Sequence, residues 1–214
     1  MKVVRVWDKA VRFYHWSQVL LLGGLWWTAE QGMMEWHQVL AYSLAAVLLA
    51  RLVWAFVGSE TARFSHFVQK PFQALRNWDQ AKKGLGHKGL SAYMVLALMV
   101  LMLLQFVSGL MTTDEVFTEG PLYSVVPSGL ASLAGWWHHN GFNLLLGFIA
   151  IHIAAALLHA VRRDGTLAAM FTGKQQSEMP QPAEKPFWVY LILVVLILTV
   201  FVWWQGPLFQ QTLL

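Results

Sequence analysis

Long uninterrupted runs of apolar residues dominate the chain. Five of them reach the roughly 20 residues that a helix needs to cross a hydrocarbon core. These runs are residues 11–29, 36–57, 90–111, 136–161 and 187–204. They show no alternation of apolar and polar positions, and a bilayer admits only helices or closed barrels. We therefore predict an all-α fold: a transmembrane four-helix bundle to which a fifth, C-terminal transmembrane helix is added.

Polar segments divide the chain into three parts. Residues 1–175 contain the first four apolar runs, and residues 187–214 contain the last run and an uncharged tail. Between them, residues 176–186 are rich in proline, which predicts a cytoplasmic linker. The connection over residues 58–89 is too long for a tight turn, and its aromatic residues predict a short interfacial helix.

Basic residues occur in alternate connections between the apolar runs. The N-terminal segment and the second and fourth connections contain every Lys and Arg except Arg51, whereas the first and third connections contain only acidic charges. Lys and Arg are retained on the cytoplasmic side of membranes. We therefore predict a multi-pass protein of the bacterial inner membrane, with a cytoplasmic N-terminus and a periplasmic C-terminus. This distribution accounts for the net charge of +4 without a nucleic-acid partner.

Composition narrows the chemistry that the chain can support. Only 12% of its residues are charged, about half the share in a soluble domain, which agrees with a lipid environment. The chain has no cysteine, which excludes disulfides, iron–sulfur ligation and covalent haem attachment. Any cofactor must therefore be held by His, Met or carboxylate side chains.

Histidines at the ends of the apolar runs are the strongest chemical signal. His15 lies in the first run, His37 in the second and His152 in the fourth, while His138 and His139 stand together at the start of the fourth. Ionisable groups inside a membrane are costly and usually functional. Taken singly, each histidine could equally well bond to a neighbouring carbonyl at the interface.

The spacing of these histidines suggests pairs. His138 and His152 are fourteen residues apart, so they share one helix face about 21 Å apart along the axis, whereas His139 lies roughly 140° from His152. His15 enters its helix from the cytoplasmic side, as His152 does, and His37 enters from the outer side, level with His138. Two pairs at two depths match the axial ligands of two six-coordinate haems. We therefore predict His15 with His152, and His37 with His138, as the ligands of the haem irons.

Two further residues accompany these pairs. Arg51 follows His37 by fourteen residues and would arrive near the inner haem, where a guanidinium can pair with a propionate. An arginine that extends to the cytoplasmic interface is an equally good interpretation. His159, seven residues after His152, is the reserve ligand of the inner haem, and otherwise bonds a propionate or a quinone.

Several stretches of the chain resemble the bacterial cytochrome b561 family, especially the b-type cytochrome subunits of nickel–iron hydrogenases. They are VWDKAVRFYHW at 6–16, WHQVLAYSLAAVLLARLVWAFVGSETARF at 36–64, GHKGLSAYMVLALMVLMLLQFVSGLM at 86–111, HHNGFNLLLGFIAIHIAAALLH at 138–159 and LAAMFTGK at 167–174. The resemblance implies a four-helix bundle holding two non-covalent haems b, which exchanges electrons with a membrane quinone. By matched position, it implies the same four histidine ligands. The chain departs from the family at Gly86–Gly89, where the family has Gly-His-Asn-Pro, and in its fifth helix.

Three functions are compatible with these features. The first is a conduit for electrons between the quinone pool and a periplasmic redox partner. The second is a superoxide:quinone oxidoreductase, although the acidic outer connections would repel an anionic substrate. The third is the membrane anchor or cytochrome b subunit of a hydrogenase-like complex, with the acidic loop at 114–119 as a docking surface.

Overall fold

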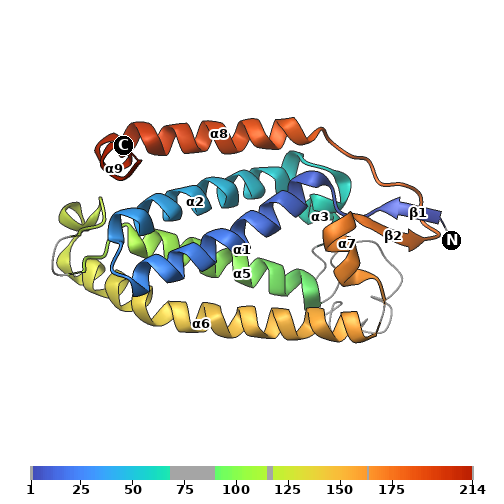
Figure 1. The fold of residues 1–214 in the computed structure, drawn as a ribbon, viewed down its shortest axis with the longest axis horizontal. Helices are drawn as coiled ribbons and strands as arrows, with labels where there is room; N and C mark the ends of the chain where they lie inside the picture. Colours follow the sequence, from blue (N-terminus) through green and yellow to red (C-terminus); the bar gives the residue numbers. More distant parts are fainter. Residues whose placement is uncertain (1, 68–89, 115–117, 163, 214) are drawn as a thin grey trace.

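Five long helices form most of the computed structural model, which describes residues 2–67, 90–114, 118–162 and 164–213 (Figure 1). They are α1 (Lys9–Glu30), α2 (Met34–Val57), α5 (Leu90–Gly109), α6 (Ser128–Val161) and α8 (Phe187–Trp204). Each helix coincides with one of the apolar runs, so the prediction of an all-α membrane bundle is confirmed in its helices.

The start of α6 differs most from its predicted position. The apolar run begins at Trp136, but the helix begins at Ser128, directly after Pro127. Pro127 is the residue before the first helical turn, and its backbone there is extended, with φ −59° and ψ 143°. The first two turns contain small residues such as Ala131 and Gly135, which hydropathy alone does not include in a membrane run.

Two short strands were not predicted. Strand β1 (Lys2–Arg5) pairs antiparallel with β2 (Lys174–Ser177), and Lys2 lies opposite Ser177. The short helix α7 (Thr166–Thr172) leads into β2. Each strand is only four residues long, which is too short for a recognisable alternation of apolar and polar positions. The partner of each strand also lies far away in the sequence, so no hairpin pattern indicates the pairing.

The remaining elements lie at the two ends of the bundle. They are η1 (Glu60–Ala62), α3 (Phe64–Phe67), η3 (Tyr123–Val125) and α9 (Gly206–Leu213). The predicted interfacial helix falls largely outside the described residues, together with Phe72, Trp78 and the turn at 86–89; only η1 and α3 belong to its described part. The C-terminal tail forms α9, whose Phe209 packs against Tyr42.

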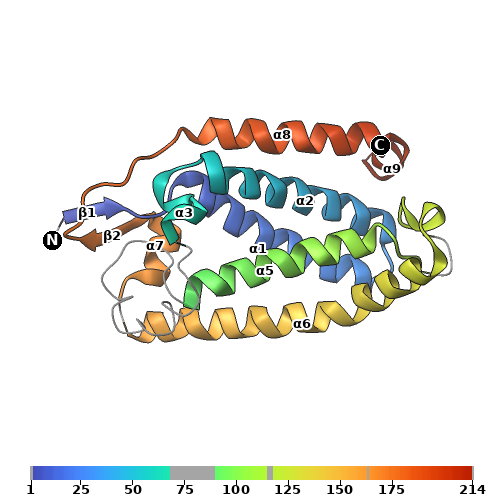
Figure 2. The same cartoon turned by 180° about the vertical axis from the view of Figure 1, so that it is seen from behind.

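Pairs of helices build the bundle. Helix α1 packs along α2, α5 packs along α6, and α8 lies beside α2 on the side away from α6 (Figures 1 and 2). Small residues such as Ala46 and Ala50 are fully buried on α2, which lets its neighbours approach closely. The Tyr190 hydroxyl of α8 donates a hydrogen bond of 2.9 Å to the Val47 carbonyl. The last helix therefore packs against α2, and its role as an added membrane span stays a prediction.

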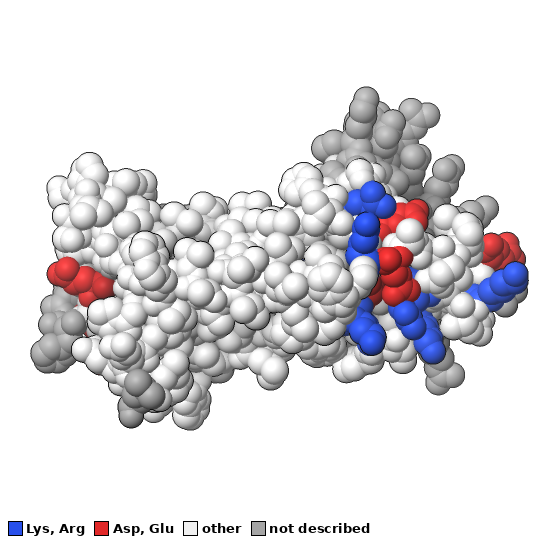
Figure 3. All heavy atoms as spheres, turned by 90° about the horizontal axis from the view of Figure 1, so that it is seen from above, with Lys and Arg blue, Asp and Glu red and all other residues white. Residues whose placement is uncertain are grey.

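Four helices of the described chain are long and apolar enough to cross a membrane: α2, residues 91–109 of α5, α6 and α8. Helix α1 is long enough as well, but Lys9, Arg12 and Gln18 lower its hydropathy. The prediction that it is a fifth span therefore stays a prediction. Figure 3 shows an uncharged middle of the molecule, with Lys and Arg side chains gathered toward the end that holds the N-terminus.

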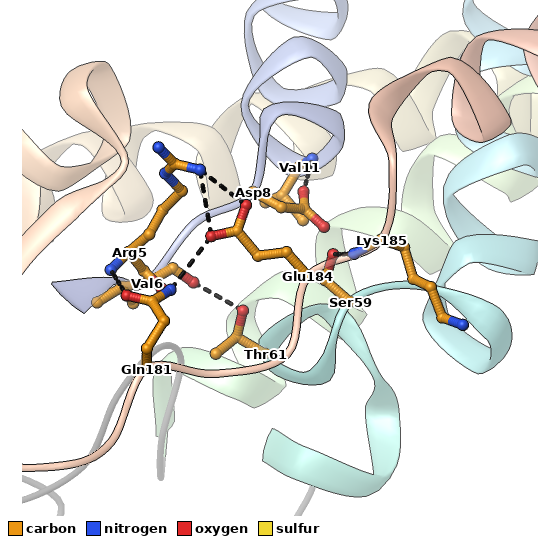
Figure 4. Close-up of polar contacts among 9 residues, drawn as sticks. All are labelled: Arg5, Val6, Asp8, Val11, Ser59, Thr61, Gln181, Glu184 and Lys185. Carbon is orange, nitrogen blue, oxygen red and sulfur yellow. Dashed lines mark hydrogen bonds and ion pairs between the residues drawn. The ribbon is translucent and has the colours of Figure 1, made fainter.

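Polar contacts secure that end (Figure 4). Asp8 caps α1 by accepting from the Val11 N–H at 2.7 Å, and its other oxygen accepts from the Trp54 indole at 3.0 Å. The Thr61 hydroxyl donates to the Val6 carbonyl at 2.7 Å. Segments that are far apart in the sequence thus supply the partners of these polar groups.

The predicted linker at 176–186 takes part in these contacts. The Lys185 N–H donates to the Ser59 hydroxyl at 3.0 Å, and Arg5 forms an ion pair with Glu184, also at 3.0 Å. Gln181 accepts a hydrogen bond from the Arg5 N–H. The linker's first two residues belong to β2, and the rest of it leads to α8 and is held along the end of the bundle by these contacts (Figure 4).

Candidate functional site

Three helices bring four of the predicted histidines together in two pairs. His15 of α1 faces His152 of α6, with ring centroids 6.3 Å apart and planes inclined by 52°. His37 of α2 faces His138 of α6, again with centroids 6.3 Å apart and with planes at 85°. The structure therefore pairs the same residues that the spacing paired, and their role as haem ligands stays a prediction.

The separation within each pair suits a shared metal ion. A first-row metal binds an imidazole nitrogen at about 2 Å, so two rings that ligate one ion from opposite sides have centroids roughly 6 Å apart. Direct contact between two neutral imidazoles would not require the same separation at two separate places. Each pair would thus fit a metal centre held by one histidine of α6 and one of α1 or α2.

Main-chain carbonyls orient the His37–His138 pair. The Nδ1 of His37 lies 3.0 Å from the Leu25 carbonyl, and the Nδ1 of His138 lies 3.0 Å from the Gln105 carbonyl. A carbonyl can only accept, so each Nδ1 carries the proton and leaves Nε2 for a metal. The Ser108 hydroxyl, buried and 3.3 Å from the same Nδ1 of His138, adds a further contact.

A cavity of about 300 Å³ opens at this pair, and both rings line it. Apolar side chains such as Met102 and Phe142 form much of its wall, which suits a flat apolar cofactor. Glu30 and Asp114 line it as well, so the cavity also carries acidic groups.

A glycine that the sequence did not single out allows His138 to take its place. A Cβ added at Gly109 would lie 2.8 Å from Cε1 of the His138 ring, too close for any side chain. Glycines elsewhere in the helices are not in such contact with a histidine ring: a Cβ added at Gly24 would meet Leu40, and nothing lies within 4 Å of one added at Gly23 or Gly147. Gly109 is the last residue of α5, and its importance follows only from its contact with His138 of α6.

The His15–His152 pair has different surroundings. The Nδ1 of His15 is buried and has no hydrogen-bond partner. Its ring meets the edge of Trp16, with centroids 4.9 Å apart and planes at 85°. Packing by an aromatic neighbour therefore orients this ring, where a carbonyl orients each ring of the other pair.

Arg51 lies inside the protein near the start of α1. Only 3% of its surface is exposed, so it does not extend to the interface as one interpretation of the sequence held. Its Nη2 donates to the Ala62 carbonyl at 3.1 Å, and its Cζ lies 5.9 Å from the centre of the Tyr14 ring. Its Nη1 is buried and has no partner. An unpaired guanidinium N–H here would suit a propionate carboxylate.

The other histidines take different places. His159 bonds to Asp164, whereas His152 is the histidine that faces the ring of His15. Burial acts to raise the pKa of the Asp164 carboxyl, but hydrogen bonds from His159 and Thr166 outweigh it and hold that pKa below its usual value. His139 lines the same cavity as His138, and their ring centroids are 6.1 Å apart.

The sequence of this chain is similar to those of known proteins. The prokaryotic cytochrome b561 family matches residues 6–173, which include both histidine pairs and Arg51. The chain belongs to this family. It is also 28% identical, over 167 residues, to a probable Ni/Fe-hydrogenase B-type cytochrome subunit of Rhizobium leguminosarum bv. viciae. That alignment covers 65% of this chain and 66% of the relative, slightly less than two thirds of the relative's length. No solved structure matches the chain.

Membership of the family establishes the class of protein. The chain is a multi-pass membrane cytochrome that uses b-type haem for transmembrane electron transfer. Helices α8 and α9 lie beyond the matched residues, so this cytochrome adds a C-terminal part to the family's region.

Proposed function

We propose that this cytochrome carries electrons through two b-type haems, one between His15 and His152 and one between His37 and His138. The observation that carries the proposal is the repeated centroid separation of 6.3 Å in both pairs. When bound, haem iron supplies one-electron oxidation and reduction. The protein's own groups hold and orient the ligands: the Leu25 and Gln105 carbonyls at one pair, and Trp16 at the other.

Helix α6 sets the distance between the two centres, because it provides one ligand to each pair. His138 and His152 are separated by about 21 Å along a straight helix, most of the thickness of a hydrocarbon core. We propose that residues 1–175 form this electron-carrying domain, in which α1 crosses the bilayer together with α2, α5 and α6. The addition at 187–214 then covers α2.

The orientation that we propose places the basic end in the cytoplasm. The His15–His152 pair then lies in the cytoplasmic half of the membrane, and the His37–His138 pair lies in the periplasmic half. The gathering of Lys and Arg side chains supports this assignment (Figure 3). Because the chain has no cysteine, single cysteines at Lys2 and Thr212 would test it with a thiol reagent that cannot cross membranes. Labelling of intact cells should occur at position 212 and not at position 2.

We propose a membrane quinone and a redox enzyme as the two electron partners. The Rhizobium relative is named as a hydrogenase subunit, which supports an enzyme partner. Glu30 and Asp114 place acidic charge at the cavity of the His37–His138 pair, where such an enzyme would dock. The same charges would repel superoxide, so the superoxide oxidase is less favoured.

Haem stoichiometry and spectra test the proposal. The purified protein should show b-type bands in a reduced-minus-oxidised spectrum and contain two haems per chain. In liposomes, a quinol should reduce both haems. One haem per chain after expression with ample haem supply would contradict the assignment of the two pairs. Haem that a quinol cannot reduce would contradict the quinone assignment alone.

A further inference from the structure

A groove of about 430 Å³ lies on the surface where α1 and α8 begin, separate from the cavity at His37 and His138. We call it the α1–α8 groove. Lys9, Arg12, Phe13 and Trp16 of α1 line it together with Phe187 of α8. The ring centroids of Phe13 and Phe187 are 5.6 Å apart, so the two helices are in contact through residues that line the groove.

We propose that the α1–α8 groove binds an acidic phospholipid. The groove's residues on α1 follow a helical stripe, since Ser17 and Leu20 continue the spacing of three and four residues that begins at Lys9. Along this stripe the chemistry changes from cations to aromatic rings and then to an aliphatic side chain. A phospholipid presents matching parts in the same order: an anionic headgroup, the interfacial region and an acyl chain.

The polar groups of the groove are suited to an anion. Lys9, Arg12 and Ser17 all carry donors, and no carboxylate lines the groove. The nearest acid in sequence, Asp8, is already engaged with Val11 and Trp54. Basic pockets between membrane helices attract acidic lipid headgroups. A neutral quinone would use the aromatic rings but would leave the two cations without a counter-charge.

The arginine of the groove is held in place before any ligand arrives. Its Nη1 donates to the Phe171 carbonyl at 2.7 Å. Phe171 in turn stacks on Trp16, with centroids 4.7 Å apart, and Trp16 therefore also has a fixed position. Lys9 is exposed and can move to meet a phosphate. One fixed and one mobile cation suit a headgroup of variable structure.

The bound lipid would connect the family's region to the added helix. Phe187 lies outside residues 6–173, whereas the other lining residues lie inside them. Helix α8 packs chiefly on α2, and its contact with α1 is smaller. A phospholipid in the groove would therefore add surface between α1 and α8 and hold α8 against the bundle.

Lipid retention and thermal unfolding of the full-length protein provide the test. Delipidated protein is supplied with phosphatidylglycerol or with phosphatidylcholine of the same acyl chains. Phosphatidylglycerol should be retained more strongly in native mass spectra and should raise the Tm more. Lys9→Gln should weaken its retention about fivefold, the effect of one surface charge. Lys174→Gln is the matched control, because Lys174 is exposed at the same end but does not line the groove.

A second variant tests the groove without changing either of its cations. Ser17→Phe fills the groove and leaves both cations, and it should abolish the preference for phosphatidylglycerol. Equal retention of both lipids by the wild type would overturn the proposal. So would inorganic phosphate that raises the Tm as much as the lipid, which would indicate a site for a soluble anion. Displacement of the lipid by a short-chain quinone, with quinone reduction lost in Lys9→Gln, would assign the groove to quinone instead.

Discussion

The two histidine pairs have equal separations, but the protein positions their rings by different means. At the His37–His138 pair, main-chain carbonyls accept from both Nδ1 atoms. At the His15–His152 pair, the Nδ1 of His15 is buried without a hydrogen-bond partner, and the edge of Trp16 fixes the ring. Helix main chain therefore sets the orientation at one end of the bundle, and side-chain packing sets it at the other.

Charge differs between the two ends as well. The buried guanidinium of Arg51 lies near the start of α1, six residues before the end of α2, whereas Glu30 and Asp114 line the cavity of the other pair. A positive charge favours the reduced state of a nearby haem, and a negative charge favours the oxidised state. The comparison predicts a higher potential for the His15–His152 centre, and each of the following changes should affect mainly one centre.

Loss of a ligand should have the largest effect. His138→Ala or His37→Ala should remove one spectral component and leave the other, because the two pairs share no side chain. His15→Ala or His152→Ala should remove the second component. Reduced-minus-oxidised spectra and haem-to-protein ratios measure the result. His139→Ala serves as the control and should keep both components; its loss of a haem would contradict the pairing.

Gly109→Ala should come next in size. The new methyl group would lie 2.8 Å from Cε1 of His138, so the ring must move and haem occupancy at the His37–His138 pair should fall severalfold. The His15–His152 component should persist. Gly147→Ala on α6 is the matched control, because nothing lies within 4 Å of the added methyl. Equal haem loss in both variants would indicate a general effect on folding.

Arg51→Gln should lower the potential of the His15–His152 centre. A unit charge roughly 10 Å from a redox centre, at an effective dielectric constant of about 20, contributes on the order of 70 mV. Redox titration followed by spectroscopy would show the shift. Arg5→Gln removes an exposed charge from the same end and should change the potential far less. A shift in the potential of the His37–His138 centre instead would contradict the assignment of Arg51 to the His15–His152 centre.

Ser108→Ala should change only the His37–His138 centre, and by less. The Ser108 hydroxyl lies 3.3 Å from the His138 Nδ1, and its loss weakens the acceptors of the Nδ1 proton. A less basic ligand stabilises ferric iron less well, so the potential should rise by on the order of 20 mV. A redox titration with no shift beyond error would show that the Gln105 carbonyl alone orients the ring.

The smallest effect should come from the ion pair of His159 and Asp164, which lies outside both pairs. The lowered pKa of Asp164 means that its contact stabilises the fold above the usual aspartate pKa of about 4 and is lost as the pH falls through the lowered value. Asp164→Asn should therefore reduce the Tm slightly at pH 7, and the reduction should become smaller as the pH falls below about 4. Both haem components should remain in the spectrum, so this variant shows how much haem is lost by a change outside both histidine pairs.

Much of this arrangement was predictable because bilayer thickness and helical periodicity act on single segments. Length and hydropathy located the helices, with α8 at the observed residues. The fourteen-residue spacing of His138 and His152 placed both on one face of α6. The same reasoning did not identify Gly109, since its role depends on a ring from another helix. It also missed β1 and β2, which flank the family's region on its two sides and pair with each other.

The sequence by itself determined a largely helical membrane cytochrome, the places of its long helices, and that His138 and His152 share one face of α6. These properties follow from rules that apply along one helix at a time. Only the tertiary structure decided that Leu25 and Gln105 present carbonyls to the rings, and that Phe187 completes a groove with α1. Such contacts depend on how neighbouring helices rotate and approach one another, and apolar faces alone permit several arrangements.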